Sequence, residues 1–237
     1  MDKRVKMQIS EIDIPDQIIQ NYSKLEPSYF NLKEWNQRTE ENLWDELVLC
    51  ILSSNLNYET AFSAFLHLQK NRFLEYRNTL KDDSYQNIAY ELCKPIFLPI
   101  KKDGSFRKYR FPNVRANNIV NAAKVIYQET EGIHALLNSF NSGYEARDFF
   151  SRRIPGIGFK EASHFLRNIK YSSSLAIIDV HIINFLEERK IPNDFIGKSL
   201  NVQKYLLYEK IMKEISSYYD YKLPIFDLAI WQYMRAR

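Results

Sequence analysis

Two ionisable residues lie where the surrounding sequence could support catalysis. Lys160 stands two residues after Gly158, in what we expect to be the first turn of a helix. The positive end of the helix dipole disfavours an ammonium there, but by only about 0.3–1 kcal/mol. A lysine that attacks an electrophilic carbon must be a free amine, so we expect desolvation in a cleft to supply the rest. A solvated surface lysine is the alternative.

Asp179 follows after the apolar run 175–178. An aspartate that precedes a helical stretch is most simply an N-cap, whose carboxylate accepts backbone N–H groups. A carboxylate at the mouth of a cleft could also stabilise positive charge that develops on a substrate. The two interpretations are compatible, and we assign His181 no catalytic role.

Residues 154–158, with the sequence IPGIG, form the most specific local pattern in the chain. Gly156 and Gly158 lie between two expected helices, at 145–153 and 159–169, so the pattern predicts a tight hairpin. Glycines there can take positive φ and leave backbone N–H groups open to a phosphate oxygen. This is the helix-hairpin-helix pattern, which is typical of proteins that hold DNA by its backbone without reading bases. A helix turn that merely contains proline and glycine is the alternative.

A basic segment also indicates that the protein binds DNA. The net charge is only +4, but residues 101–115 carry six basic side chains against one acidic side chain, with aromatic residues between them. Such a loop could follow a phosphate backbone, and we expect Arg110 and Arg115 to contact DNA. A solvated loop with a few anchoring aromatic side chains is the alternative.

The composition of the 237-residue chain is that of an ordinary folded protein, with 45% hydrophobic and 26% charged residues. A chain of this length can bury a sizeable core without staples. Cys50 and Cys93 are the only cysteines, which excludes a disulfide scaffold and a four-thiolate zinc or iron–sulfur site. We therefore expect a reducing, intracellular compartment. No apolar run approaches the roughly 18 residues that span a bilayer.

The spacing of apolar residues is helical almost throughout, as in Leu43, Leu47 and Ile51. Few segments alternate with period two. We predict an all-α protein of about ten helices. Without a proline- or serine-rich linker, residues 1–237 should form a single two-lobed unit with a cleft, in which 145–170 is the helix-hairpin-helix motif. We assign no role to residues 1–40.

Longer strings around these residues resemble a known family. Residues 154–168 read IPGIGFKEASHFLRN, and residues 175–182 read LAIIDVHI. Both are similar to the helix-hairpin-helix DNA glycosylases, and most similar to the archaeal-type, or second type, of 8-oxoguanine DNA glycosylase/AP lyase. Further similar segments are residues 46–55, 109–116 and 228–231.

The resemblance implies a two-lobed helical fold that binds damaged double-stranded DNA across its cleft. It implies removal of an oxidised purine, 8-oxoguanine, and then strand nicking by β-elimination. Lys160 would form the Schiff base and Asp179 would be the catalytic aspartate. The resemblance implies no required cofactor, and it allows a monovalent cation to bind at the hairpin. We further expect a monomer that acts with the DNA in the cytoplasm or nucleoid of a prokaryote, without membrane association.

The same resemblance suggests residues that handle the damaged base. Asn55 would fill the gap that the flipped base leaves, although a loop residue without such a role is an equal alternative. Asp227 and Trp231 share one helix face, so Trp231 could stack on a purine while Asp227 accepts its N–H groups. Arg237 would close the pocket with its terminal carboxylate. A core tryptophan with a helix-capping aspartate is the alternative.

Two departures from the family pattern bear on the excised base. Val180 stands where the family usually has arginine, and the chain stops at Arg237, six residues after Trp231. A glycosylase acting on a different damaged base, a non-catalytic DNA-binding module and an all-α protein-interaction domain are alternatives. A module would not need Lys160 and Asp179 together, so their joint presence at the family's spacing favours the enzyme.

Overall fold

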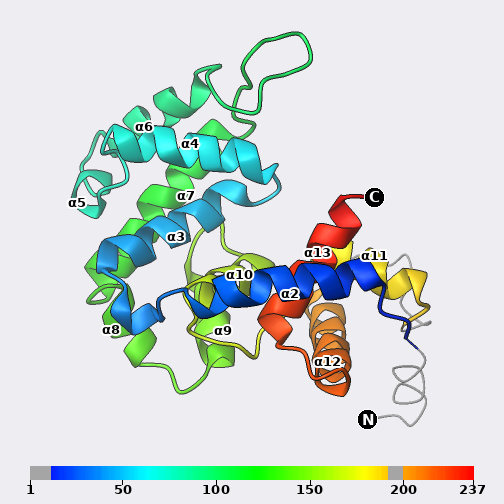
Figure 1. Ribbon diagram of the computed structural model, residues 1–237. Helices are drawn as coiled ribbons and strands as arrows, with labels where there is room; N and C mark the ends of the chain where they lie inside the picture. Colours follow the sequence, from blue (N-terminus) through cyan, green and yellow to red (C-terminus); the bar gives the residue numbers. More distant parts are fainter. Residues whose placement is uncertain (1–11, 192–199) are drawn as a thin grey trace. The chain divides into compact units, whose positions relative to one another are not determined.

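The computed structural model describes residues 12–191 and 200–237 (Figure 1). Within these residues the secondary structure is helical, and the one β pairing is an isolated bridge between Phe97 and Arg107. The prediction of an all-α protein is confirmed. None of the helices in the described ranges has the length and apolar character needed to cross a membrane.

The chain divides into two compact units. We call Glu34–Ile169 the central unit, because it comes from the middle of the chain. We call the described residues of 12–33 and Lys170–Arg237 the terminal unit, because they come from both ends.

Helix α3 is the core of the central unit. Its buried side chains include Leu43, Leu47 and Ile51, and α4, α7 and α10 pack around it. Thr39 begins α3 as an N-cap, since its hydroxyl accepts the Asn42 N–H at 3.2 Å. The helices of this unit are a 3-10 turn at Trp35–Gln37, α3 Glu40–Ser53, α4 Tyr58–Lys70, α5 Tyr76–Thr79, α6 Ser84–Cys93, α7 Pro112–Lys124, a π turn at Val125–Glu129, α8 Ile133–Asn138, α9 Gly143–Arg153 and α10 Phe159–Asn168.

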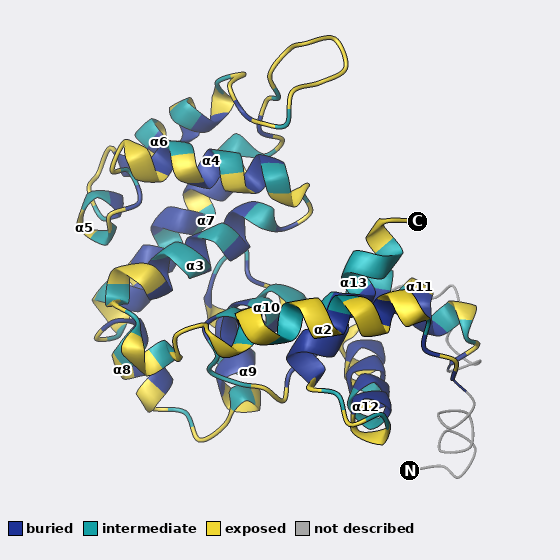
Figure 2. Cartoon of the chain, viewed as in Figure 1, coloured by how far each residue is buried: buried dark blue, intermediate teal, exposed yellow. Residues whose placement is uncertain are grey.

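Helix α13 (Leu223–Arg235) is the core of the terminal unit, as α3 is of the central unit. Helices α2 (Asp16–Phe30), α11 (Val180–Glu188) and α12 (Val202–Tyr218) pack against it. Figure 2 shows α13 mostly dark along its first turns, where Ile225, Phe226 and Ile230 are buried. No role was assigned to residues 1–40, yet α2 from this region packs against α13.

Candidate functional site

The hairpin between α9 and α10 turns at Gly156, whose φ is +82°. An L side chain is strained at this φ, and a Cβ there would also collide with the side-chain amide of Asn118. The neighbouring Ile154 and Ile157 are buried, and the Ile157 N–H donates to the Ile154 carbonyl at 3.2 Å. Glycine at position 156 is therefore required both by the turn and by the close approach of α7.

Gly158 behaves differently from the prediction. Its φ of −94° and ψ of −172° are extended values that any residue adopts, so the expectation of positive φ is wrong here. Gly158 is the N-cap of α10 and makes no side-chain capping bond. Without a side chain at this position, the first N–H groups of α10 can donate to an external acceptor, which suits an anion.

Lys160 lies in the first turn of α10, as predicted. Its side chain is 36% exposed, and its Nζ lies 3.3 Å from Glu161 Oε1. The buried side chains of Ala162, Phe165 and Leu166 fix the other face of the helix. The lysine is thus held at the edge of a packed helix and is not deeply buried by the protein alone.

His164, one turn after Lys160, is a neutral group at neutral pH. Burial lowers the pKa of its imidazole to about 3, and the positive charges of Arg167 and Lys160 act in the same direction. The sequence analysis gave His164 no role. The structure makes it an uncharged neighbour of the candidate nucleophile.

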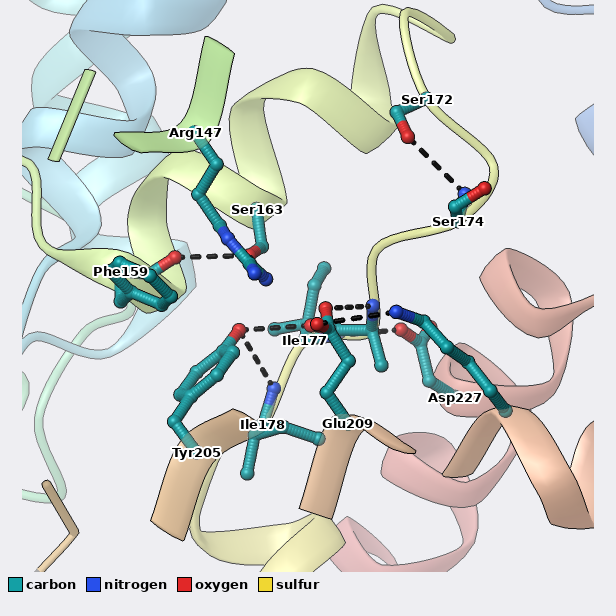
Figure 3. A network of polar contacts seen from close by, with 12 residues as sticks. Arg147, Phe159, Ser163, Ser172, Ser174, Ile177, Ile178, Tyr205, Glu209 and Asp227 are labelled. Carbon is teal, nitrogen blue, oxygen red and sulfur yellow. Dashed lines mark hydrogen bonds and ion pairs between the residues drawn. The ribbon is translucent and has the colours of Figure 1, made fainter. Parts of the chain in front are cut away.

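The first turn of α10 is supported by Arg147 of α9, whose side chain is buried. Its guanidinium carbon lies 4.4 Å from the centre of the Phe159 ring, and its Nη1 donates to Ser163 Oγ at 3.4 Å. The Ser163 hydroxyl in turn donates to the Phe159 carbonyl at 3.0 Å (Figure 3). These contacts fix the residue that directly precedes Lys160.

Asp179 is the N-cap of α11 in the terminal unit, as predicted. Its Oδ1 accepts the N–H groups of His181 at 2.9 Å and Ile182 at 3.0 Å. The carboxylate is thereby fixed against the first turn of α11, where the helix dipole favours its negative charge. Val180, which replaces the arginine usual in the family, is exposed.

Asp227 is buried and contacts the backbone that leads to Asp179. Its side chain is 2% exposed, and its Oδ2 accepts the Ile177 N–H at 2.9 Å. It lies in the second turn of α13, after the N-cap Lys222, so it does not cap that helix either. The structure therefore gives the Asp227 carboxylate a partner in the backbone just before Asp179, and the direct base contact stays a prediction.

Trp231 and Arg237 lie toward the end of the chain. Trp231 is half-buried, and its ring meets the His181 ring edge-on at 6.1 Å and the Arg235 guanidinium at 4.9 Å. Arg237 is exposed, and its Nη1 donates to Glu188 Oε2 at 2.7 Å. The tryptophan is therefore not a fully buried core residue, and its stacking on a purine stays a prediction.

Three further expected DNA contacts belong to the central unit. Arg110 is exposed, with its guanidinium 4.9 Å from the Phe111 ring centre. Arg115 is only 6% exposed and donates to the Ser54 carbonyl, and its expected phosphate contact stays a prediction. Asn55 is exposed in the loop after α3 and has a positive φ of 56°. Arg115 therefore supports the residue next to Asn55 and does not itself form the surface.

The predicted site residues are divided between the units. The central unit holds Asn55, Arg110, Arg115, Gly156, Gly158 and Lys160. The terminal unit holds Asp179, Asp227, Trp231 and Arg237. Sequence reasoning missed the support given by Arg147 to α10, and that given by Glu209 and Tyr205, which accept the N–H groups of Ala176 and Ile178 just before Asp179. Each of these side chains occupies an inward-facing position of an amphipathic helix, and that is the signal that could have found them.

The helical fold and the glycine hairpin that leads into Lys160 define a helix-hairpin-helix DNA glycosylase. The sequence model of a family described as "8-oxoguanine DNA glycosylase" matches residues 99–221, more than half of the chain. The chain belongs to the 8-oxoguanine DNA glycosylase family.

Named relatives agree with this assignment. The chain is 34% identical to an "8-oxoguanine DNA glycosylase/AP lyase" of Sulfurisphaera tokodaii over 83% of this chain and 84% of the relative. It is 33% identical to the protein of the same name from Methanocaldococcus jannaschii over 95% and 91%.

Solved structures extend the likeness to the fold. The M. jannaschii glycosylase/lyase in complex with a 15mer DNA containing 8-oxoguanine is similar with a TM-score of 0.66 and 28% identity, over 99% of this chain and 98% of that one. The 8-oxoguanine DNA glycosylase of Thermotoga maritima matches in fold with a TM-score of 0.70 at 23% identity, over 98% of both chains.

Proposed function

We propose that this protein is a bifunctional DNA N-glycosylase/AP lyase that removes 8-oxoguanine from double-stranded DNA and then nicks the strand. The observation that carries the proposal is the position of Lys160 in the first turn of α10, directly after the Gly156 hairpin. In one short motif, a helix N-terminus suited to a phosphate precedes an amine suited to attack a sugar carbon.

In the proposed reaction, Lys160 Nζ attacks C1′ of the damaged nucleotide as a free amine. The bond from C1′ to the base breaks, and the base leaves with its electron pair and takes up a proton. The C1′–O4′ bond then breaks with a proton taken up on O4′, which opens the sugar and leaves a Schiff base between C1′ and Nζ, and this makes the C2′ proton acidic. Loss of that proton gives an enamine, whose electrons form the C2′–C3′ double bond and expel the 3′-phosphate, and water then hydrolyses the imine and releases the lysine.

Asp179 stabilises the positive charge that develops on the sugar as the base departs. Its carboxylate is held by two backbone N–H groups on Oδ1, so it needs little reorganisation during the reaction. Since the Lys160 side chain is 36% exposed beside Glu161, we propose that the bound duplex excludes the water that surrounds the amine.

Borohydride trapping on a duplex with one 8-oxoguanine tests this function. A covalent protein–DNA adduct, formed in the presence of a chelator, is the expected result, because the mechanism needs no metal. If no lesion duplex gives an adduct while DNA affinity is intact, the protein is a non-catalytic DNA-binding module. An adduct on another lesion alone would identify a different excised base.

We propose that the enzyme acts as a monomer on double-stranded DNA, in the compartment that holds the DNA of a prokaryotic cell. The proposal rests on the chemistry of the substrate, since a single nucleophile and a single carboxylate serve one damaged nucleotide. Light scattering during gel filtration, with and without a lesion duplex, tests the stoichiometry. A two-to-one complex with DNA would contradict it.

A further inference from the structure

The segment 176–178, which leads directly into Asp179, has an unusual set of hydrogen-bond partners. It runs extended beside helices, so no neighbouring strand accepts its backbone N–H groups. Three consecutive N–H groups instead donate to side chains of α12 and α13 (Figure 3). In chain order, these bonds are Ala176 N–H to Glu209 Oε1 at 3.1 Å, Ile177 N–H to Asp227 Oδ2 at 2.9 Å and Ile178 N–H to Tyr205 Oη at 3.3 Å.

All three accepting side chains are buried. The Tyr205 hydroxyl also donates to the Ala176 carbonyl at 2.9 Å, and Lys213 Nζ lies 3.2 Å from Glu209 Oε2. Burial of a carboxylate is costly unless hydrogen bonds and charges compensate it. Two such carboxylates directed at adjacent residues of one short segment therefore indicate a position that must be held accurately.

The segment continues without a break into Asp179, which caps α11. Asp179 is thus fixed from both sides in the chain: by the bonds to residues 176–178 before it, and by the first turn of α11 after it. Both supports depend on α13, because α11 and α12 pack against that helix. A change in these side chains would reach the Asp179 carboxylate through the backbone.

We propose that Tyr205, Glu209 and Asp227 are positioning residues that set the Asp179 carboxylate for the reaction. We call them the 176–178 clamp. The inference rests on the proposed function and goes further, because it assigns Asp227 to the aspartate loop and not to recognition of the base. A carboxylate displaced by about 1 Å can lose on the order of 10²-fold in rate, so the clamp should act on turnover and leave DNA affinity nearly unchanged.

The test compares two substitutions of Asp227. Asp227→Ala removes the acceptor of the Ile177 N–H, whereas Asp227→Asn keeps a carbonyl oxygen that can accept it. We expect Asp227→Ala to slow single-turnover excision of 8-oxoguanine by about 10–100-fold, and Asp227→Asn to restore most of that loss. Nicking of a preformed abasic site should fall in parallel. The dissociation constant for DNA should change by less than about threefold.

A double mutant separates positioning from general support of the fold. If Asp227 acts through Asp179, then adding Asp227→Ala to Asp179→Asn changes the remaining rate very little. Ser172→Ala is the matched control, because Ser172 Oγ accepts the Ser174 N–H at 3.2 Å in the exposed part of the same connection. It should leave every rate unchanged.

Three results would overturn the inference. One is a loss of 8-oxoguanine excision in Asp227→Asn with normal nicking of abasic sites, since that would show base recognition. Another is a double mutant whose loss in rate equals the product of the losses in the two single mutants. The third needs no activity: hydrogen exchange of the Ile177 amide must accelerate in Asp227→Ala, and unchanged exchange would show that the bond does not hold the segment. Failure of the proposed function is separate, because the unmodified protein would then form no adduct.

Discussion

The two candidate catalytic residues are positioned in opposite ways. Lys160 depends on nearby sequence: the 154–158 hairpin precedes it, and the bond from Arg147 to Ser163 links residues 16 apart. Asp179 depends on distant sequence, since the bonds that hold residues 176–178 span 27, 33 and 50 residues. The bonds that support Lys160 lie mostly within one helical hairpin, whereas those that hold residues 176–178 form only when α12 and α13 have packed beside the segment.

The difference predicts how each residue can fail. A local motif keeps its geometry as long as its own turn is intact, so changes elsewhere should affect Lys160 little. A support made from distant side chains couples the Asp179 carboxylate to the packing of the whole terminal unit. We therefore expect remote substitutions in the terminal unit to slow the reaction more often than remote substitutions in the central unit.

Lys160→Gln should have the largest effect, because it removes the amine and leaves both supports intact. We expect a loss of at least about 10³-fold in excision and in nicking, and no borohydride adduct. DNA affinity, measured by fluorescence anisotropy, should stay within a few-fold. Lys124→Gln, which changes an exposed lysine at the end of α7, is the control and should form the adduct normally. Nicking at the normal rate by Lys160→Gln would mean that another residue is the nucleophile.

Asp179→Asn should come next. Asparagine caps a helix about as well as aspartate, so the melting temperature should change little while single-turnover excision falls by about 10²–10³-fold. The melting temperature and the single-turnover rate are measured for the variant and for the unmodified protein. A large drop in melting temperature with normal activity would show that Asp179 serves only as a cap.

Arg147→Met tests the local support of Lys160. Methionine fills much of the same buried space but loses the bond to Ser163 and the cation–π contact with Phe159. We expect about a tenfold slower trapping reaction and a loss of about 1–3 kcal/mol in the free energy of unfolding. Urea unfolding and the trapping rate check both effects. If the trapping rate is unchanged, Arg147 supports the fold alone.

Substitutions of the two hairpin glycines should have different effects, one on stability and the other on DNA affinity. Gly156→Ala should destabilise the protein by roughly 1–3 kcal/mol, because φ is +82° and the added Cβ meets Asn118. Gly158→Ala has ordinary dihedral angles, and its Cβ would lie 3.1 Å from the end of the flexible Glu161 side chain, which has to shift only slightly. We therefore expect nearly normal stability and about five- to tenfold weaker binding to every duplex, whatever its sequence. Anisotropy with two unrelated duplexes measures this. Weaker binding to one sequence alone would argue against a phosphate contact at Gly158.

The smallest effect concerns acid stability beside Lys160. A free histidine titrates near pH 6.5, whereas the pKa of His164 is lowered to about 3. Between these values the unfolded chain binds one more proton than the folded protein. The contribution of neutral His164 to stability is therefore full above about pH 6.5 and is lost as the pH falls toward 3.

His164→Gln removes this titration. The difference between the urea midpoints at pH 7 and pH 4.5 should therefore shrink relative to the unmodified protein. An unchanged difference would place the acid sensitivity on other groups.

The sequence predicted the parts of the site that depend on local rules. Helical periodicity located the helices, the glycine pattern located the hairpin, and the position of Asp179 before an apolar helix indicated its capping role. The spacing of Ile119, Ala122 and Ile126 likewise predicts a helix over residues 114–127. In the structure it begins at Pro112, since proline is favoured in a first helical turn, and its last turn widens into a π turn.

The parts that could not be predicted are those in which a polar side chain faces inward. Arg115 and Asp227 were expected to contact DNA at the surface, because charged side chains are normally solvated. The residues close to them in sequence do not indicate which buried groups they bind. Their acceptor and donor, the Ser54 carbonyl and the Ile177 N–H, lie 61 and 50 residues away. Such pairs form only through tertiary packing, which periodicity does not describe.

The packing of α2 against α13 determines when the terminal unit can fold during synthesis. The Asn21 side chain donates to the Ala229 carbonyl, 208 residues later. At about 5–20 residues per second, a ribosome needs roughly 10–40 seconds between these residues. The central unit is contiguous in sequence and can fold during this interval, whereas α2 has to wait for α13. Each newly made chain should therefore possess its nucleophile hairpin before the Asp179 loop is held in place, so that nicking activity appears only once translation is nearly complete.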